Sequence, residues 1–220
     1  MNTNSNSYTI IYASVMVIIV AFLLAFVSSS LKERQDKNVE LDKMKQILTS
    51  LNITDVEDAE KTYNQYIKSD LIIDLNGNTI SENGGFDLGA EDDRLAVFVC
   101  DVNGATKYIL PLYGKGMWDA IGGYLCLNDD KQTIYGAFFS HKGETPGLGA
   151  EITTPKFQNQ YQQKQIFEGN QLVGIRVVKG GGASGAHQVD AISGGTITSQ
   201  GVEAMIKNYL TNYEPFLKQR

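Results

Sequence analysis

The sequence predicts an α+β fold, in which an antiparallel sheet domain with flanking helices follows one N-terminal transmembrane helix. Three observations predict it: an uncharged apolar run near the N-terminus, β-rich segments separated by turn signals, and helical periodicity on both sides of these segments. The 220 residues suit one domain with an appendage. We expect a tail and anchor in residues 1–30, a helical connector in 31–69 and the α+β domain in 70–220.

The anchor is predicted from residues 8–27, which carry no charge. At about 1.5 Å per residue, a helix over this run spans the hydrocarbon thickness of about 30 Å. A cleaved signal peptide is the alternative, but the run is longer than the usual apolar region of about 7–15 residues and no basic residue precedes it. Lys32, Arg34 and Lys37 follow the run, so the positive-inside rule alone would keep the C-terminal domain in the cytoplasm.

Helices are expected before and after the sheet. Apolar residues between Val39 and Leu51 recur at helical spacing, so we expect the anchor to continue into an amphipathic helix. The other expected helices are one that starts at Thr54-Asp55, one from Lys156 onward after the capping pair Thr154-Pro155, and a last one marked by Val202, Met205, Ile206 and Leu210.

The middle of the chain has the pattern of antiparallel hairpins. Asn103-Gly104 is the strongest turn signal, because both residue types tolerate a positive φ. Cys100 and Cys126 lie on two predicted strands; they could pair if the domain is exported, but an ordinary buried role is favoured. The predicted strands are two short ones within 70–80 about a turn at Asn76-Gly77, then 94–101, 107–113, 121–127, 133–140 and 171–179.

Composition and charge exclude several functions. With 19 Lys and Arg against 25 Asp and Glu, the net charge is -6, so no nucleic-acid partner is expected. Two Cys and two His are too few for a Cys/His zinc site unless all four converge, so no metal site is predicted. His141 and His187 are expected to be surface or structural residues. We predict no catalytic residues in this chain.

Two glycine-containing segments have ambiguous patterns. Residues 180–185 (GGGASG) fit a dinucleotide-binding pattern. That interpretation requires a helix to open there, whereas Ser193-Gly194-Gly195 soon interrupts the chain again, so we reject it. Residues 114–118 (GKGMW) contain Trp118, the single Trp of the chain, which suits either core packing or stacking on a planar ligand.

A tight loop is predicted at residues 143–149 (GETPGLG), which hold three glycines and a proline. Its glycines allow backbone N–H groups to approach a ligand closely. Glu144 supplies an acceptor, Thr145 a hydroxyl and Leu148 an apolar contact. Considered alone, this loop is better explained as a structural turn.

Residues 190–199 (DAISGGTITS) stand just before the last helix and have two interpretations. In the first, Thr198 or Ser199 is an N-cap. In the second, Ser193, Thr196 and Thr198 line an anion site, because a helix N-terminus presents unpaired N–H groups and favours phosphate. No Walker lysine is present in the segment, so it is not a nucleotide-hydrolysing loop.

Three of these segments resemble signatures of the FMN-binding domain family. Residues 190–196 resemble the flavin-attachment motif D-x-x-(S/T)-G-A-T, with Gly195 in place of Ala. Residues 144–149 (ETPGLG) and 114–118 (GKGMW) resemble two further signatures. With the N-terminal anchor, the whole chain resembles the family of C subunits of Na⁺-translocating NADH:quinone reductases. The family of G subunits of Rnf electron-transport complexes is a near relative and the alternative.

The resemblance implies that FMN is joined through its phosphate to the Thr196 hydroxyl by a flavin transferase that uses FAD. Asp190, Ser193 and Gly194 match motif positions for that transfer, and Gly195 is a small-for-small change. The remaining implied cofactor contacts are Glu144, Thr145, Leu148 and Gly149 along the isoalloxazine ring and Trp118 stacked near it.

The resemblance also implies an electron-carrying subunit of a membrane complex that couples NADH:quinone oxidoreduction to Na⁺ export. The other subunits of that complex and the membrane are the implied partners, and this chain alone holds no complete active site. The FMN-binding domain, residues 70–220, would lie on the extracytoplasmic side of the bacterial inner membrane, against the charge bias of residues 32–37. An anchored binding or assembly module without a cofactor remains the alternative from composition.

Overall fold

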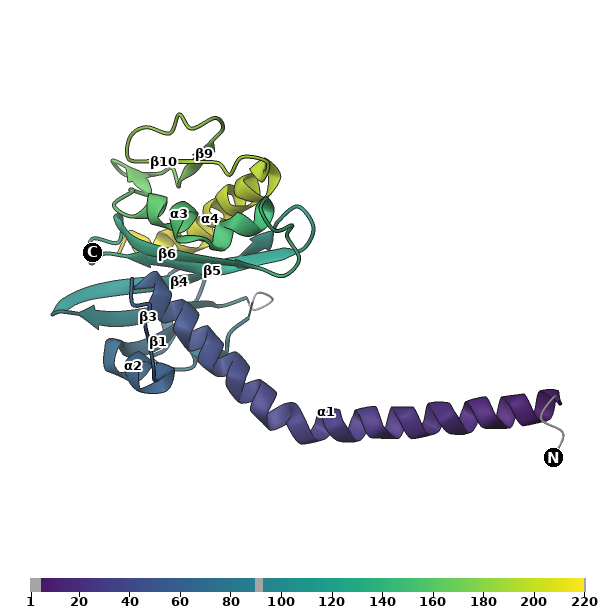
Figure 1. Ribbon diagram of the computed structural model, residues 1–220. Coiled ribbons are helices and arrows are strands. Elements are labelled where there is room, and N and C mark those ends of the chain that lie inside the picture. Colours follow the sequence, from purple (N-terminus) through teal and green to yellow (C-terminus); the bar gives the residue numbers. More distant parts are fainter. Residues whose placement is uncertain (1–4, 90–92, 220) are drawn as a thin grey trace. The chain divides into compact units, whose positions relative to one another are not determined.

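The protein divides into two compact units after Lys43 (Figure 1). The computed structural model describes residues 5–89 and 93–219. In the first unit, the described residues belong almost entirely to α1 (Asn6–Ser50), the one helix of the described chain that is long and apolar enough to cross a membrane. No described side chain of this unit is buried, as expected for a helix whose apolar surface packs against lipid. The predicted helical continuation is confirmed, because α1 runs on to Ser50.

The second unit is built on a six-stranded antiparallel sheet with the strand order β2-β1-β3-β4-β5-β6. The predicted α+β class is therefore confirmed. The sheet strands are β1 (Ile67–Ile73), β2 (Thr79–Ser81), β3 (Leu95–Val102), β4 (Ala105–Lys115), β5 (Ala120–Leu127) and β6 (Ile134–His141). Two short pairs stand apart from it: β7 (Phe167–Glu168) with β8 (Gln171–Leu172), antiparallel, and β9 (Arg176–Val178) with β10 (Gln188–Asp190), parallel.

The predicted hairpins are confirmed. Val102 pairs with Ala105 across the β3–β4 turn, where Asn103 has φ +55° and Gly104 has φ +80°. Two consecutive positive φ values match the right-handed twist of the flanking strands. The helical elements are α2 (Ala59–Tyr66), α3 (Pro155–Gln158), α4 (Thr196–Leu217) and the 3-10 turns η1 (Gly85–Asp87), η2 (Gly149–Thr153) and η3 (Asn159–Tyr161).

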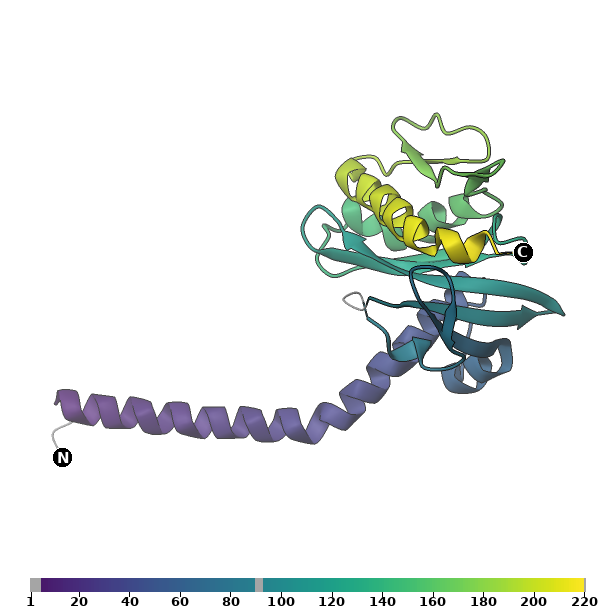
Figure 2. The same cartoon turned by 180° about the vertical axis from the view of Figure 1, so that it is seen from behind.

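Helix α4 covers one face of the sheet and carries the main core (Figures 1 and 2). The predicted inward residues Val202, Met205, Ile206 and Leu210 are all buried on the side of α4 that packs on β4 and β5. Gly114 of β4 permits the close approach, because a Cβ there would stand 2.7 Å from Cβ of Met205. This packing fixes where the N-terminus of α4 lies against the β4–β5 turn.

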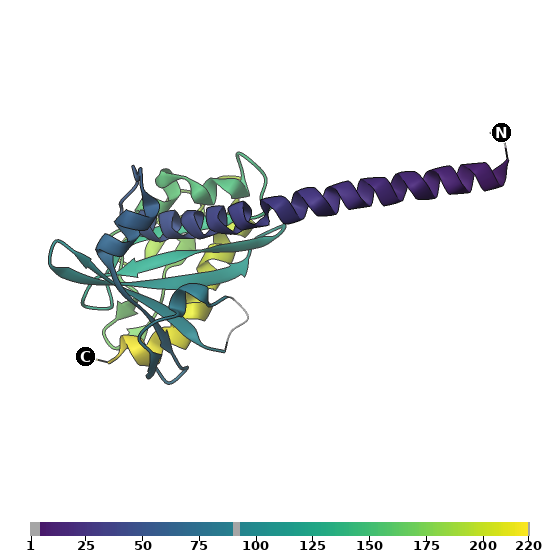
Figure 3. The same cartoon turned by 90° about the horizontal axis from the view of Figure 1, so that it is seen from below.

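The other face of the sheet is covered by α2 and by the last turns of α1, which belong to the second unit (Figure 3). Asn52 follows α1 and donates from Nδ2 to the carbonyl oxygen of Tyr135 on β6, at 3.1 Å. Side chains alternate along a strand, so Cys100 of β3 and Cys126 of β5 point to this face. Both thiols are free and buried, which confirms the ordinary role favoured for them.

Two expected helices differ from the structure. Helix α2 begins at Ala59 and not at Thr54-Asp55, because the Asp58 carboxylate accepts the Lys61 N–H at 3.0 Å and caps the helix there. The helix expected from Lys156 onward is only the single turn α3, which passes directly into η3.

Two further boundaries also differ. The strand expected over 171–179 is divided into β8 and β9, because Gly174 adopts φ +67° between them. The last helix begins at Thr196, with Gly195 as N-cap, and neither Thr198 nor Ser199 is the cap. Ser199 instead lies inside the first turn, where its hydroxyl donates to the Gly195 carbonyl at 2.8 Å and accepts the Ile192 N–H at 3.1 Å.

Candidate functional site

Three loops meet at the N-terminus of α4 (Figures 1 and 2). They are the β4–β5 turn at 116–119, the loop after β6 at 142–148, and the segment 191–195 that follows β10. A Cβ on Gly201 of α4 would stand 2.6 Å from the Lys115 carbonyl oxygen, and one on Gly194 would stand 2.6 Å from Cδ2 of Leu148. The three glycine-rich segments that resemble family signatures are therefore adjacent in space, although they lie far apart in the sequence.

The Glu144 carboxylate connects these loops. The side chain is only 4% exposed; Oε1 accepts the Trp118 N–H at 2.9 Å and Oε2 accepts the Thr198 hydroxyl at 2.5 Å. Burial favours the neutral acid, but the hydroxyl of Thr198 and the N–H groups of Trp118, Asp119 and Met117 outweigh it, so the pKa of Glu144 is lowered. The carboxylate is ionised at neutral pH, and its donors come from the turn at 116–119 and from the first turn of α4.

Two glycines leave room for this carboxylate. A Cβ on Gly116 would stand 2.9 Å from Cδ of Glu144, and one on Gly149 would overlap both Oε2 of Glu144 and the Thr198 hydroxyl. The backbone of Glu144 is also held, because its N–H donates to Nδ1 of His141 at 3.2 Å. His141 thus has a structural contact, as expected.

The first turn of α4 presents Thr196 at its N-terminal end. Gly194 has φ +75° and Gly195 is the N-cap, so the chain turns sharply into a helix of 22 residues. The first N–H groups of any helix lack acceptors within it, and the helix dipole adds positive potential at this end. Thr196 is partly buried, whereas Ser193 and Gly194 just before it are exposed. An anion can therefore approach the first N–H groups of the helix from the side of Ser193 and Gly194.

Asp190 is oriented away from this turn. Its Oδ1 accepts the Ala183 N–H at 2.8 Å, and its own N–H donates to Oε1 of Gln160 at 2.8 Å. The side chain therefore holds the GGGASG loop at 180–185, a segment for which the sequence indicated no role.

Exposed apolar side chains surround the first turn of α4. Trp118 is 65% exposed and Ile197 is 56% exposed, and Met117 and Leu148 are exposed as well. Of the described residues from 44 to 219, the only other large apolar side chains with such exposure are Leu75 and Ile80. A cluster of this kind on a folded domain marks a surface that binds an apolar partner or a planar ring.

The expected site residues thus divide into groups. Trp118 and Leu148 reach the surface, Glu144, Gly149 and Thr198 lie beneath it, and Asp190 faces the neighbouring loop. Thr145 is exposed, and its carbonyl accepts the N–H groups of residues 148 and 150. The sequence analysis placed Gly116 and Met117 within a signature segment but gave them no role, and it did not identify Ile197 or the contact of His141. Ile197 could have been found from the sequence, because it is an apolar residue that does not fall on the helical spacing of the inward face of α4.

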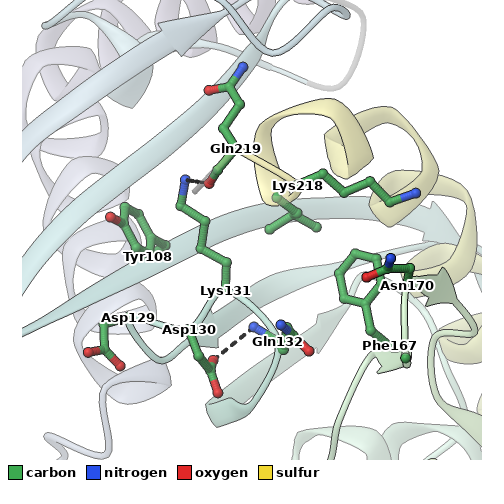
Figure 4. A pocket seen from close by; sticks show the side chains of 11 residues that line it. Tyr108, Asp129, Asp130, Lys131, Gln132, Phe167, Asn170, Lys218 and Gln219 are labelled. Carbon is green, nitrogen blue, oxygen red and sulfur yellow. Dashed lines mark hydrogen bonds between the residues drawn. The ribbon is translucent and has the colours of Figure 1, made fainter.

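A separate groove lies at the opposite end of α4. Its volume is about 840 Å³, and Figure 4 shows Lys131 within it, pointing toward Gln219. The ammonium of Lys131 donates to the carbonyls of Phe216 and Gln219 at 3.3 and 3.1 Å, and lies 4.1 Å from the centre of the Phe216 ring. This cation therefore caps the helix C-terminus, and no expected site residue lines the groove.

Comparison with known proteins identifies the class of this domain. Residues 116–211 match the family model described as "FMN-binding domain", and this range includes all three loops. The fold and the site thus define an FMN-binding domain, and in this chain a long apolar helix precedes it.

Relatives and solved structures narrow the class further. The chain is 32% identical to the C subunit of the Na⁺-translocating NADH-quinone reductase of Pasteurella multocida, covering 98% of this chain and 95% of that protein. The C subunit from Haemophilus ducreyi is 30% identical with the same coverage. The crystal structure of the C subunit from Parabacteroides distasonis superposes with a TM-score of 0.82 at 42% identity, over 86% of this chain and 98% of that one. The crystal structure of Shewanella oneidensis NqrC superposes with a TM-score of 0.74 at 25% identity, over 83% of this chain and 98% of that one. The chain belongs to the family of C subunits of Na⁺-translocating NADH-quinone reductases.

Proposed function

We propose that this protein carries FMN bound covalently through its phosphate to the hydroxyl of Thr196, and that it acts as an electron carrier. The observation that supports the proposal most directly is the position of Thr196. It is the first residue of α4, at the positive end of a 22-residue helix, and exposed apolar side chains surround this turn. Both ends of FMN, an anionic phosphate and an apolar ring system, match this surface.

The residues at the site have distinct roles in this proposal. The N–H groups of the first turn of α4 stabilise the phosphate charge, and Ser193 and Gly194 leave the approach to the hydroxyl open. Trp118, Leu148 and Ile197 pack against the isoalloxazine ring and exclude water from part of it. FMN, when bound, supplies one- and two-electron transfer, which none of the side chains can provide.

Attachment requires a flavin transferase as a partner. Transfer of FMN from FAD to the Thr196 hydroxyl forms one phosphoester bond, breaks the pyrophosphate bond of FAD, and releases AMP. The open approach at Ser193 and Gly194 is suited to an enzyme that must reach the hydroxyl.

The relatives named above are subunits of a Na⁺-translocating NADH-quinone reductase. By this similarity we infer that the chain assembles with other subunits of such a complex and passes electrons toward quinone while the complex exports Na⁺. Helix α1 would anchor it in the bacterial inner membrane, with the FMN domain on the extracytoplasmic side. Protease added to spheroplasts should then digest residues 44–220. Digestion only in inside-out vesicles would instead place the domain on the cytoplasmic side, which is the orientation that Lys32, Arg34 and Lys37 favour.

The attachment is tested on a denaturing gel, where only covalent flavin remains fluorescent. In cells that contain the transferase, the wild type and Thr196→Ser should both show a fluorescent band, because each retains a hydroxyl. Thr196→Val, which keeps the shape and loses the hydroxyl, should be dark. Thr211→Val is the matched control, because Thr211 is exposed on the same helix and its hydroxyl donates to the Lys207 carbonyl. Mass spectrometry of the wild-type peptide 180–207 should show a mass increase equal to that of FMN less one water. An unmodified peptide mass would exclude the proposal.

A further inference from the structure

The carboxylate of Glu144 joins the two parts of the proposed flavin site. Oε1 binds the turn that carries Trp118, and Oε2 binds Thr198, which lies two residues after Thr196 in the first turn of α4. Glu144 and Thr198 are 54 residues apart in sequence, and Glu144 and Trp118 are 26 apart. One buried side chain thereby links the backbone of the turn that carries the indole to the helical turn that carries the attachment point.

The position of this carboxylate is tightly determined. The carboxylate packs so closely against Gly116 on one side and Gly149 on the other that neither position has room for a Cβ. His141 accepts the backbone N–H of Glu144. With 4% of its surface exposed and both oxygens engaged, Glu144 has little capacity to contact a ligand on the surface. Its effect on a bound ring is therefore exerted through the residues that it holds.

We propose that Glu144 is a positioning residue, which sets the place of Trp118 relative to the flavin on Thr196. This inference rests on the proposed function and extends it, because it assigns Glu144 to the support of the indole and not to the surface against the ring. Without the carboxylate, the Trp118 N–H loses its acceptor, and the hydrogen-bonded link from the turn at 116–119 through Glu144 to Thr198 of α4 is broken.

The 3-10 turn η2, which follows the loop that carries Glu144, offers a matched control. Glu151 is also acidic, and its Oε1 accepts the Gly147 N–H at 3.2 Å, close to it in sequence. This hydrogen bond joins two neighbouring positions and does not involve the turn at 116–119. A Glu151→Ala variant therefore removes one negative charge and one hydrogen bond from the same segment without releasing Trp118.

The first test uses the full chain in detergent, made in cells without the transferase, so that no flavin is present. Amide hydrogen exchange in the segment 116–119 should be at least about tenfold faster in Glu144→Ala than in the wild type, since an acceptor of the Trp118 N–H is lost. Glu144→Gln should stay within about threefold, because its amide oxygen still accepts this N–H and its NH₂ can donate to the Thr198 hydroxyl. Glu151→Ala should exchange like the wild type.

The second test uses the flavin-loaded chain. Trp118 is the single Trp, so its emission reports its distance from FMN. Attached FMN should quench this emission in the wild type and in Glu144→Gln, and by a clearly smaller factor in Glu144→Ala. If Glu144→Ala does not fold, Thr198→Val tests the same link from its other end and should also weaken the quenching.

Two results would overturn the positioning role: wild-type exchange and quenching in Glu144→Ala, or a Glu144→Gln variant as defective as Glu144→Ala. Failure of the proposed function is distinguished from both. In that case the wild type carries no flavin on Thr196, while exchange in the flavin-free chain still reports whether Glu144 holds the turn.

Discussion

Replacement of Thr198 by Val tests the buried contact on which the site depends. Thr198 is 2% exposed, and its hydroxyl donates to the Glu144 carboxylate at 2.5 Å. Valine keeps the shape of the side chain and removes the donor. A hydrogen bond to a charged group contributes about 1.5–3 kcal/mol, so the free energy of unfolding should fall by about 2 kcal/mol. For a unit of this size, that loss lowers the melting temperature by about 4–8 °C.

The measurement is thermal unfolding of the full chain in mild detergent, followed by far-ultraviolet circular dichroism. Thr211→Val is the control, because that hydroxyl is exposed and donates to a carbonyl of its own helix; its melting temperature should lie within about 1 °C of the wild type. The flavin should still attach to Thr196 in Thr198→Val. If Thr198→Val melted at the same temperature as the control, the short contact would contribute no net stability and the expected loss would be wrong.

Packing, pH and thiol chemistry provide further tests. Gly149→Ala should destabilise the domain by about 1–3 kcal/mol in the same melting assay, because its Cβ would overlap Glu144 and Thr198, whereas Gly143→Ala, whose Cβ meets only Asp119 at 3.4 Å, should be tolerated. The folded pKa of Glu144 lies below its ordinary value of 4.5, so its stabilising contribution is complete above that pH and is lost as the pH falls through the folded value. Melting curves of Glu144→Gln should therefore depend less on pH below about 5 than those of the wild type. Burial raises the pKa of Cys100 to about 12 and that of Cys126 well above its ordinary value, so iodoacetamide should label neither thiol until the domain unfolds, and rapid labelling of the native chain would contradict their burial.

Much of the fold could be predicted because its signals are local. The turn at Asn103-Gly104 depends on two residues that accept positive φ. The inward face of α4 depends on apolar residues at helical spacing. Boundaries were less accurate. Gly174 breaks a segment that is otherwise typical of a strand, and Gly195 takes the N-cap position where Thr198 and Ser199 had the better capping side chains. Gly174 breaks the strand through its positive φ of +67°. At Gly195 the cause is close packing, because a Cβ there would stand 2.9 Å from the Leu148 carbonyl oxygen.

The apolar helix at the N-terminus, the antiparallel hairpins and the three segments with family signatures could all be recognised in the amino-acid sequence. These features depend on hydropathy and backbone preference within a few residues, and a single chain displays both directly. The burial of Glu144 with its hydrogen bonds to Trp118 and Thr198, and the contact of Asp190 with a neighbouring glycine loop, became visible only in the folded chain. A contact across 54 residues arises from the packing of α4 against the sheet, and no local pattern encodes which side chains that packing brings together.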